Sequence, residues 1–269
     1  MSTSSSRGIL YVAVQSARYR EEALISAASV KRKTGFRLPI TIATDQPESP
    51  VIRAGRESGI FDEVVTADRW PACRIPWAHG QLVRIGQLRK TPYEHTLHLD
   101  TDTKIVGDRL ETIFAEFSDS DIAMAEAEAQ SSYSRLHFQR PLFNTGVILY
   151  RRSHRTDEWL ESWWELSSRN FRLAQQRVLQ LPTELSNFSA DGEMLRRLLC
   201  MDQISLAATM YPGWNRFGLK VATLEPVWNH RGGCAPASEQ TQILHERSGS
   251  DEAHAAELEA VLEAMAKLS

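Results

Sequence analysis

The sequence predicts an α/β protein in which helices flank a mixed, mostly parallel central sheet, with a Rossmann-like N-terminal half. Short apolar runs alternate with segments of helical periodicity over the first hundred residues, which is typical of β-α-β units and a parallel sheet. The chain has 269 residues and a hydrophobic content of 42%, which is enough for a sizeable buried core. We find no internal repeat, low-complexity tract or convincing linker, so a single domain over residues 8–269 is the simplest organisation.

The N-terminal part of the chain shows this alternation most clearly. An apolar run at residues 9–14 predicts a strand, and the helical periodicity that follows it stops at Gly35, a residue type that commonly ends helices. Two further strands are predicted at residues 40–44 and 60–65, with a short helix between them. We therefore expect residues 8–106 to form a nucleotide-binding half.

The remainder of the chain contains the same two kinds of element. A helix is expected to begin at Asp108, because Glu111 three residues later completes the pattern of a capping box. The residues after 250 place apolar side chains on one face, as in a capped amphipathic helix at 250–269, and the polar residues 1–7 are expected to form a disordered tail. The other elements that we expect are helices at 80–89 and 157–169 and strands at 95–99, 122–125, 141–150 and 243–247.

Composition excludes several classes of function. The formal net charge of -3 and the sequence pI near 6.3 offer no broad attraction to nucleic acid or anionic lipid. The apolar run at residues 9–14 is too short for a signal peptide or a membrane span. The three cysteines, Cys73, Cys200 and Cys234, lack the paired spacing of a zinc site and favour a reducing compartment. We expect a cytoplasmic protein with no nucleic-acid partner and no membrane span.

Asp100 and Asp102 directly follow the predicted strand at residues 95–99. Successive side chains of a strand alternate between faces, and the end of a strand in an open α/β sheet is where ligands bind. Two carboxylates at this place suit Mg²⁺ or Mn²⁺. The alternative is a simple strand-to-loop turn in which Asp100 caps backbone donors and Asp102 is solvated.

Two later segments place polar residues inside apolar surroundings. Asn144, Thr145 and Gly146 interrupt an apolar strand, and a glycine there indicates either a bulge alone or the close approach of a ligand. Asp202 and Gln203 follow an apolar helical pattern, where a carboxylate needs a partner or a function because an unpaired buried charge is costly.

Two basic residues remain ambiguous when each is considered alone. Arg84 lies midway along the predicted helix at 80–89 and is either solvated or a phosphate contact. His245 lies in the short predicted strand at 243–247, and a single histidine of this kind is more often structural than functional.

Taken in order, these motifs resemble those of the A-type-fold glycosyltransferases, most nearly the family eight and glycogenin-like nucleotide-diphosphosugar transferases. The resemblance covers about residues 8–248. One departure concerns the end of the chain, where the His-x-x-Gly-x-x-Lys-Pro-Trp pattern of family eight is absent after His245, so that Arg247 or Arg84 would have to replace its phosphate-contacting lysine. The matching motifs are Leu99-Asp100-Thr101-Asp102, Asn144-Thr145-Gly146, Asp202-Gln203 and His245.

The resemblance implies a metal-dependent glycosyltransferase that uses a nucleoside-diphosphate sugar of the UDP or GDP type and a carbohydrate or other hydroxyl acceptor. Asp100, Asp102 and His245 would coordinate Mn²⁺ or Mg²⁺, and the imidazole favours Mn²⁺. The metal would bridge the two phosphates of the donor. The resemblance also favours retention of configuration.

The same resemblance assigns further residues to the donor and the acceptor. Asp202 and Gln203 would face the anomeric carbon, with Asp202 either deprotonating the acceptor or holding the donor sugar. Residues 107–248 would form the acceptor and sugar half, in which Asn144, Thr145 and Gly146 line the pocket. The base and ribose would contact Val14, Gln15, Ser16, Tyr19, Asp100 and Thr101.

Two other functions remain open from the sequence. The segment Asp100-Thr101-Asp102-Thr103 also matches the nucleophile motif of haloacid dehalogenase-type phosphatases, although three predicted strands precede it and no Gly-Asp-x-x-Asp follows. A non-catalytic nucleotide-sugar-binding module would keep the metal site without turnover, and the presence of Asp202 argues against it.

Overall fold

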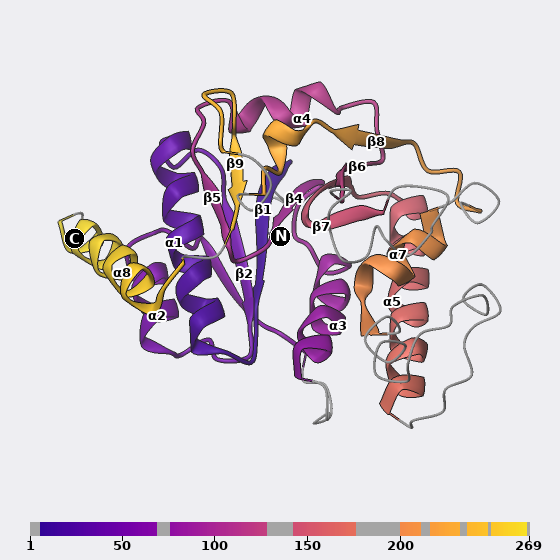
Figure 1. Ribbon diagram of the computed structural model, residues 1–269, viewed down its shortest axis with the longest axis horizontal. Helices are drawn as coiled ribbons and strands as arrows, with labels where there is room; N and C mark the ends of the chain where they lie inside the picture. The colour runs from indigo at the N-terminus through magenta and orange to yellow at the C-terminus, as the bar shows by residue number, and fades with distance from the viewer. Residues whose placement is uncertain are drawn as a thin grey trace.

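The computed structural model describes residues 6–68, 76–127, 142–175, 200–210, 216–231, 236–246 and 249–267 (Figure 1). Within these residues a seven-stranded sheet has the strand order β3-β2-β1-β4-β7-β6-β8. The strands of this sheet are β1 (Arg7–Ala13), β2 (Ile40–Thr44), β3 (Glu63–Thr66), β4 (His95–Leu99), β6 (Ile122–Glu126), β7 (Phe143–Arg151) and β8 (Val221–Leu224).

The sheet is mixed but mostly parallel, as the sequence predicts. Strand β1 pairs in parallel with both β2 and β4, β2 pairs in parallel with β3, and β6 pairs in parallel with β8. Strand β7 alone runs against its neighbours β4 and β6. The carboxyl end of β4 and the start of β7 therefore meet at the same edge of the sheet, where β4 is followed by Asp100.

Helices cover both faces of the sheet (Figure 1). One apolar core contains buried residues of α1, α2, α4 and α8 packed on one face, and a second contains those of α3, α5 and α7 on the other. Their bounds are α1 (Ala17–Thr34), α2 (Pro50–Glu57), α3 (Pro76–Leu88), α4 (Ile113–Glu116), α5 (His154–Gln175), α7 (Asp202–Met210) and α8 (Asp251–Ala266).

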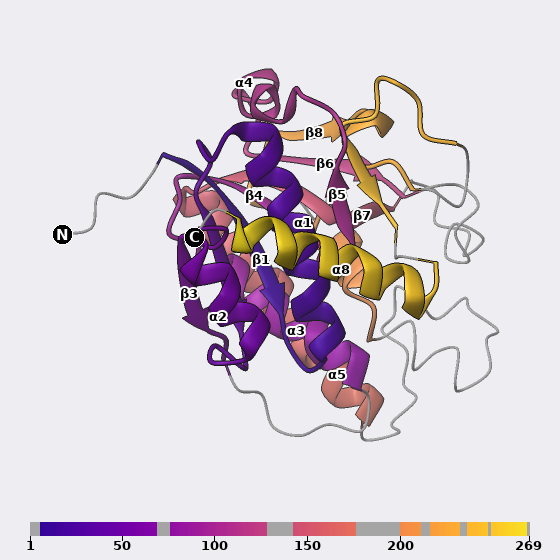
Figure 2. The ribbon, with the colours of Figure 1, turned by 90° about the vertical axis from the view of Figure 1, so that its left-hand side faces the viewer.

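A second, two-stranded sheet joins β5 (Thr103–Ile105) to β9 (Ile243–His245), which are antiparallel. A short 3-10 helix, η3 (Pro226–Trp228), precedes the segment that runs beside β9. Helix α8 lies across α1 (Figure 2), and polar contacts join the two helices, with Arg18 Nη1 2.6 Å from Asp251 Oδ1. No helix in the described part of the chain has both the length and the apolar character needed to span a membrane.

The predicted helix starts and ends agree with the structure at some positions and differ at others. Gly35 ends α1 with a φ of 58°, a left-handed conformation that glycine adopts readily. The capping box predicted at Asp108 does not form: a 3-10 turn, η1 (Leu110–Thr112), comes first, and the Asp108 carboxylate accepts a hydrogen bond from Lys33 Nζ at 2.7 Å instead. Arg7 already belongs to β1 although the sequence analysis placed it in the tail, and residues 1–5 lie outside the described residues.

Candidate metal centre

Three side chains from distant parts of the chain converge at the carboxyl end of β4. Asp100, Asp102 and His245 each offer one ligand atom, and these atoms all lie within 4.8 Å of one another. His245 Nε2 is 3.2 Å from Asp102 Oδ1 and 3.8 Å from Asp100 Oδ2. The pairing of β5 with β9 brings them together, because it sets Thr103 opposite His245.

The turn after β4 points the two carboxylates in one direction. The Asp100 backbone N–H donates to Gly146 O at 2.7 Å, and the Thr103 hydroxyl closes the turn by donating to Asp100 O at 2.8 Å. Thr101, between the two carboxylates, donates its hydroxyl to Glu22 of α1 at 3.3 Å. The turn is therefore present, but the hydrogen bonds that close it go to the Asp100 carbonyl and not to its carboxylate, so both carboxylates can face His245.

The two oxygens of Asp100 have different environments. Oδ1 accepts a hydrogen bond from Arg84 Nη1 at 2.5 Å and lies 3.5 Å from His98 Nε2, whereas Oδ2 faces His245. Burial raises the pKa of the Asp100 carboxyl, but the charge of Arg84 and the hydrogen bond with His98 lower it by more. The net direction of the pKa is downward, so the Asp100 carboxyl is ionised at neutral pH.

Arg84 of α3 connects the carboxylates of the candidate metal site to Asp202. Its guanidinium donates to Asp100, to Thr145 Oγ1 at 3.0 Å and, through a short contact, to Asp202. Arg84 is 9% exposed and Asp202 is 3% exposed. The buried carboxylate of Asp202 thus has the partner that its burial requires.

The first turn of α7 fixes the orientation of Asp202. Its backbone N–H donates to Gln81 Oε1 at 3.2 Å, and its carbonyl accepts a hydrogen bond from Trp163 Nε1 at 3.1 Å. The Gln203 backbone N–H donates to Asp202 Oδ1 at 2.9 Å, so that the side chain caps its own helix. Helices α3 and α5 therefore hold the backbone of Asp202, and the first turn of α7 itself holds the carboxylate.

These residues line one polar cavity of about 500 Å³. Such a volume falls within the range of ordinary ligand pockets. A set of two carboxylate oxygens and one imidazole nitrogen suits Mn²⁺ or Mg²⁺. The described lining residues are Gln81, Arg84, Asp100, Asp102, Asn144, Thr145, Gly146, Met201, Asp202, Gln203, Arg231 and His245.

Comparison with known proteins identifies the fold. No family model and no curated protein matches the sequence. The solved structure of the galactosyltransferase LgtC, in complex with donor and acceptor sugar analogues, is similar over 97% of this chain and 96% of LgtC, with 14% identity and a TM-score of 0.60. The fold is that of the A-type glycosyltransferases.

Two further A-type glycosyltransferases are larger than this chain. GlyE of Streptococcus pneumoniae TIGR4 has a TM-score of 0.56 at 14% identity over 96% of this chain, which spans 63% of GlyE. The bifunctional WbbM has a TM-score of 0.54 at 10% identity over the whole chain, which spans 52% of WbbM. At these identities the comparisons establish the A-type fold.

The residues predicted at the end of β1 are not among the described residues that line the cavity. Val14 is buried in a small apolar cluster, Ser16 caps α1, and Tyr19 packs partly buried against the core. Gln15 has a φ of 75° and donates its backbone N–H to Asp45 Oδ2 at 2.9 Å. Their contact with a nucleotide stays a prediction, as does that of Thr101; Arg247 lies outside the described residues.

The structure shows why position 146 is a glycine, and the sequence indicated that explanation only in part. A Cβ at this position would overlap Cε1 of His245, so the close approach predicted there is made by the imidazole of a metal-ligand candidate. The register between β6 and β7 also shifts here, between Met124 and Glu126. The irregular strand expected at this glycine is confirmed, whereas the approach of a ligand stays a prediction, because the group that comes close is the protein's own imidazole.

Three lining residues and one supporting residue were missed by the sequence analysis. Gln81, Met201 and Arg231 line the cavity, and Asn229 accepts a hydrogen bond from His245 Nδ1 at 2.9 Å without lining it. Gln81 lies three residues before Arg84, so the period of the helix offered a signal for it. Arg231 and Asn229 follow η3, and no sequence periodicity connects them to the site.

Proposed function

We propose that this protein is a metal-dependent glycosyltransferase that moves a sugar from a nucleoside-diphosphate sugar to an acceptor hydroxyl, with retention of configuration. The observation that carries the proposal is the convergence of Asp100, Asp102 and His245 beside Asp202 in one cavity of an A-type fold. Mn²⁺ or Mg²⁺ held there would act as a Lewis acid toward the diphosphate leaving group.

The cavity contains protein charges suited to both ends of the breaking bond. Asp202 is held by Arg84 as a carboxylate, which accepts hydrogen bonds and stabilises positive charge as it develops on the anomeric carbon. Arg84 donates its described hydrogen bonds to Asp100, Thr145 and Asp202. The exposed Arg231 lines the same cavity, and we assign it the contact with the diphosphate.

A haloacid dehalogenase-type phosphatase has less support. LgtC and GlyE, to which this chain is similar in fold, are glycosyltransferases, and an imidazole faces the Asp-x-Asp carboxylates from β9. A phosphatase of that type would release inorganic phosphate from a phosphomonoester, whereas a sugar transferase would not.

Thermal shift with nucleotides and metals tests the proposed function. A ligand that binds only the folded state at about one hundred times its Kd stabilises that state by about 2.7 kcal/mol, equivalent to about 5–10 °C in melting temperature. We expect UDP or GDP to produce such a shift only with Mn²⁺ or Mg²⁺ present. Equal stabilisation in EDTA would contradict the metal bridge.

Product analysis then separates the transferase from a non-catalytic binding module. A screen of nucleotide sugars with Mn²⁺ identifies the donor by thermal shift, and NMR of the anomeric proton of the product reports the stereochemistry. Binding without donor hydrolysis or transfer would favour the module, and an inverted anomer would contradict retention.

A further inference from the structure

Asn229 lies behind His245, on the side of the imidazole that faces away from Asp102. The segment that carries it runs along β9 and is joined to it by backbone hydrogen bonds on either side of Asn229. Gln242 N–H donates to Val227 O at 2.8 Å, and His230 N–H donates to Ile243 O at 2.9 Å. Asn229 is only 6% exposed, so its side-chain amide has little access to water.

A chain of three hydrogen bonds determines how this amide is oriented. The Gly146 backbone N–H can only donate, and it donates to Asn144 Oδ1 at 2.8 Å. Asn229 Nδ2 donates to the same oxygen at 2.9 Å. The other end of the Asn229 amide is therefore its oxygen, and this oxygen lies 2.9 Å from His245 Nδ1.

The orientation of the amide decides which ring nitrogen of His245 carries the hydrogen. An amide oxygen only accepts hydrogen bonds, so Nδ1 must carry the N–H. In the neutral ring Nε2 then holds the lone pair, and Nε2 is the atom 3.2 Å from Asp102 Oδ1. The nitrogen that can bind a cation thus faces the carboxylates that can bind the same cation.

Without Asn229 the carboxylates would oppose this arrangement. Asp102 lies within hydrogen-bonding reach of Nε2, so in protein without metal it favours a hydrogen on Nε2, and an Nε2–H cannot coordinate a metal. Gly146 leaves the space that the imidazole occupies, but it cannot select a tautomer. That selection requires an acceptor at Nδ1, and Asn229 is the acceptor that the structure shows there.

We propose that Asn229 is a positioning residue that, held by Asn144, keeps His245 in the Nδ1–H tautomer with the Nε2 lone pair directed at Asp100 and Asp102. Asn229 is absent from the described lining of the cavity and so acts through His245. The effect of Asn229 on metal affinity rests on the proposed function, whereas the assignment of the His245 tautomer does not.

Two-bond ¹H–¹⁵N correlation NMR of metal-free, ¹⁵N-histidine-labelled protein tests the tautomer directly, at a pH where the ring is neutral and with Asp, Ala and Leu variants at position 229. We expect the Nδ1–H pattern for His245 in the wild type and in Asn229→Asp, which keeps an oxygen acceptor for Nδ1. In Asn229→Ala and the closer-sized Asn229→Leu we expect Nε2–H to become the major form. The His245 peaks are assigned by their loss in His245→Gln. Circular dichroism shows which of the Ala and Leu variants, here called the truncations, are folded.

Titration with Mn²⁺ alone, followed by its electron paramagnetic resonance signal, provides the second measurement. Loss of the partner that orients a ligating histidine typically weakens metal binding about 10–100-fold, which we expect for the truncations but not for Asn229→Asp. A wild type with Nε2–H, or folded truncations that keep Nδ1–H, would overturn the proposal whatever the Mn²⁺ result. If the tautomer moves as expected but the wild type does not bind Mn²⁺, the metal centre fails and the role of Asn229 in the tautomer stands.

Discussion

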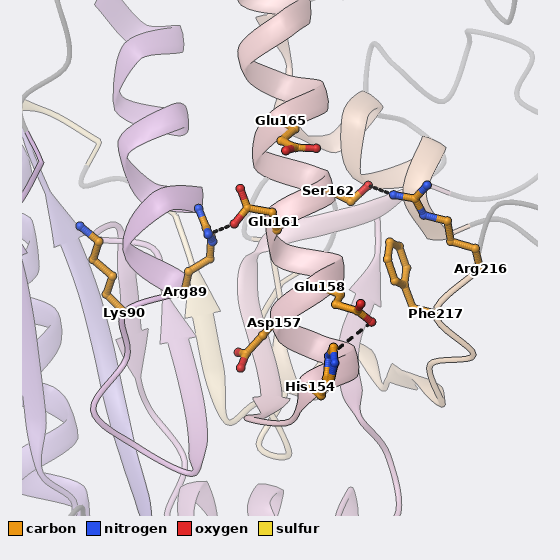
Figure 3. Close-up of a pocket in the computed structure, with 10 residues that line it drawn as sticks. All are labelled: Arg89, Lys90, His154, Asp157, Glu158, Glu161, Ser162, Glu165, Arg216 and Phe217. Atoms are coloured by element: carbon orange, nitrogen blue, oxygen red, sulfur yellow. Dashed lines mark hydrogen bonds and ion pairs between the residues drawn. The ribbon is translucent and has the colours of Figure 1, made fainter.

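Among the described residues, two hollows that are rich in carboxylates invite comparison, and the larger of them is not the candidate site. A groove of about 820 Å³ lies between the end of α3 and the outer face of α5 (Figure 3), compared with about 500 Å³ for the cavity at the end of β4. The groove extends toward the opposite edge of the sheet, where β7 ends and α5 begins. Volume alone would therefore not select the candidate site.

The two hollows differ in where their carboxylates come from. Those of the groove, Asp157, Glu158, Glu161 and Glu165, all lie on α5, at a spacing that any solvated helix face provides. Glu158 lies 3.5 Å from His154 one turn earlier, and Arg89 pairs with Glu161. Both carboxylates are exposed, at 55% and 39%, so water supplies much of their stabilisation.

The cavity, in contrast, collects its charges from separate elements and partly buries them. Asp100 and Asp102 follow β4, Asp202 begins α7 and His245 ends β9, and the last two are only 3% and 7% exposed. Bringing like charges together in a poorly solvated place is costly unless a cation or a bound ligand compensates. Convergence from distant segments, together with burial, therefore distinguishes a functional cluster from a solvated face.

Asp102→Asn tests this distinction most strongly. Loss of a ligand from a Lewis-acid site removes several kcal/mol of transition-state stabilisation, so we expect donor hydrolysis and transfer to fall about 10³-fold. The matched variant Glu161→Gln in the groove should leave both rates unchanged. Steady-state assays with Mn²⁺, with circular dichroism to verify folding, measure the difference. Full activity in Asp102→Asn, or equal losses in the two variants, would remove the functional contrast between the hollows.

The next largest effect concerns the buried pair Arg84 and Asp202. Arg84→Met leaves the 3%-exposed Asp202 carboxylate without its cation, which we expect to lower the free energy of unfolding by about 3 kcal/mol. Urea denaturation measures this loss. The double variant Arg84→Met/Asp202→Asn removes the stranded charge and should recover much of it. A double variant no more stable than Arg84→Met would show that Arg84 contributes by packing rather than by compensating Asp202.

The sequence predicts the sheet and the two candidate carboxylates because both depend on local patterns, whereas His245 joins them only through the family resemblance. Alternating apolar runs indicate parallel strands, and Asp100 with Asp102 at a strand end indicates either a ligand site or a simple turn, between which the later motifs decide. The capping box expected at Asp108 fails because a tertiary partner, Lys33 of α1, binds the carboxylate. No local pattern could foresee that competition.

The supporting residues of the site could not be predicted for a related reason. Asn229 acts through the register of its segment against β9 and through Asn144, and Arg231 reaches the cavity from the same segment. Gly146 is an intermediate case, since its sequence context predicted a close approach but not that the imidazole of His245 makes it. What joins these residues is tertiary geometry, which has no period along the chain.

Arg89→Met tests the smallest expected effect. Arg89 directly follows α3 and pairs with Glu161 across the groove, as Arg84 of α3 pairs with Asp202 inside the cavity. The Arg89 side chain is 34% exposed and also lies 5.7 Å from the centre of the Trp164 ring. Exposed pairs of this kind are screened by water and salt, so we expect a loss of about 0.5–1 kcal/mol in urea denaturation, smaller still at high salt, with catalytic rates unchanged. A loss as large as that of Arg84→Met would mean that exposure to water does not weaken the ion pair of the groove relative to that of the cavity. The two hollows would then differ only in whether they bind a ligand.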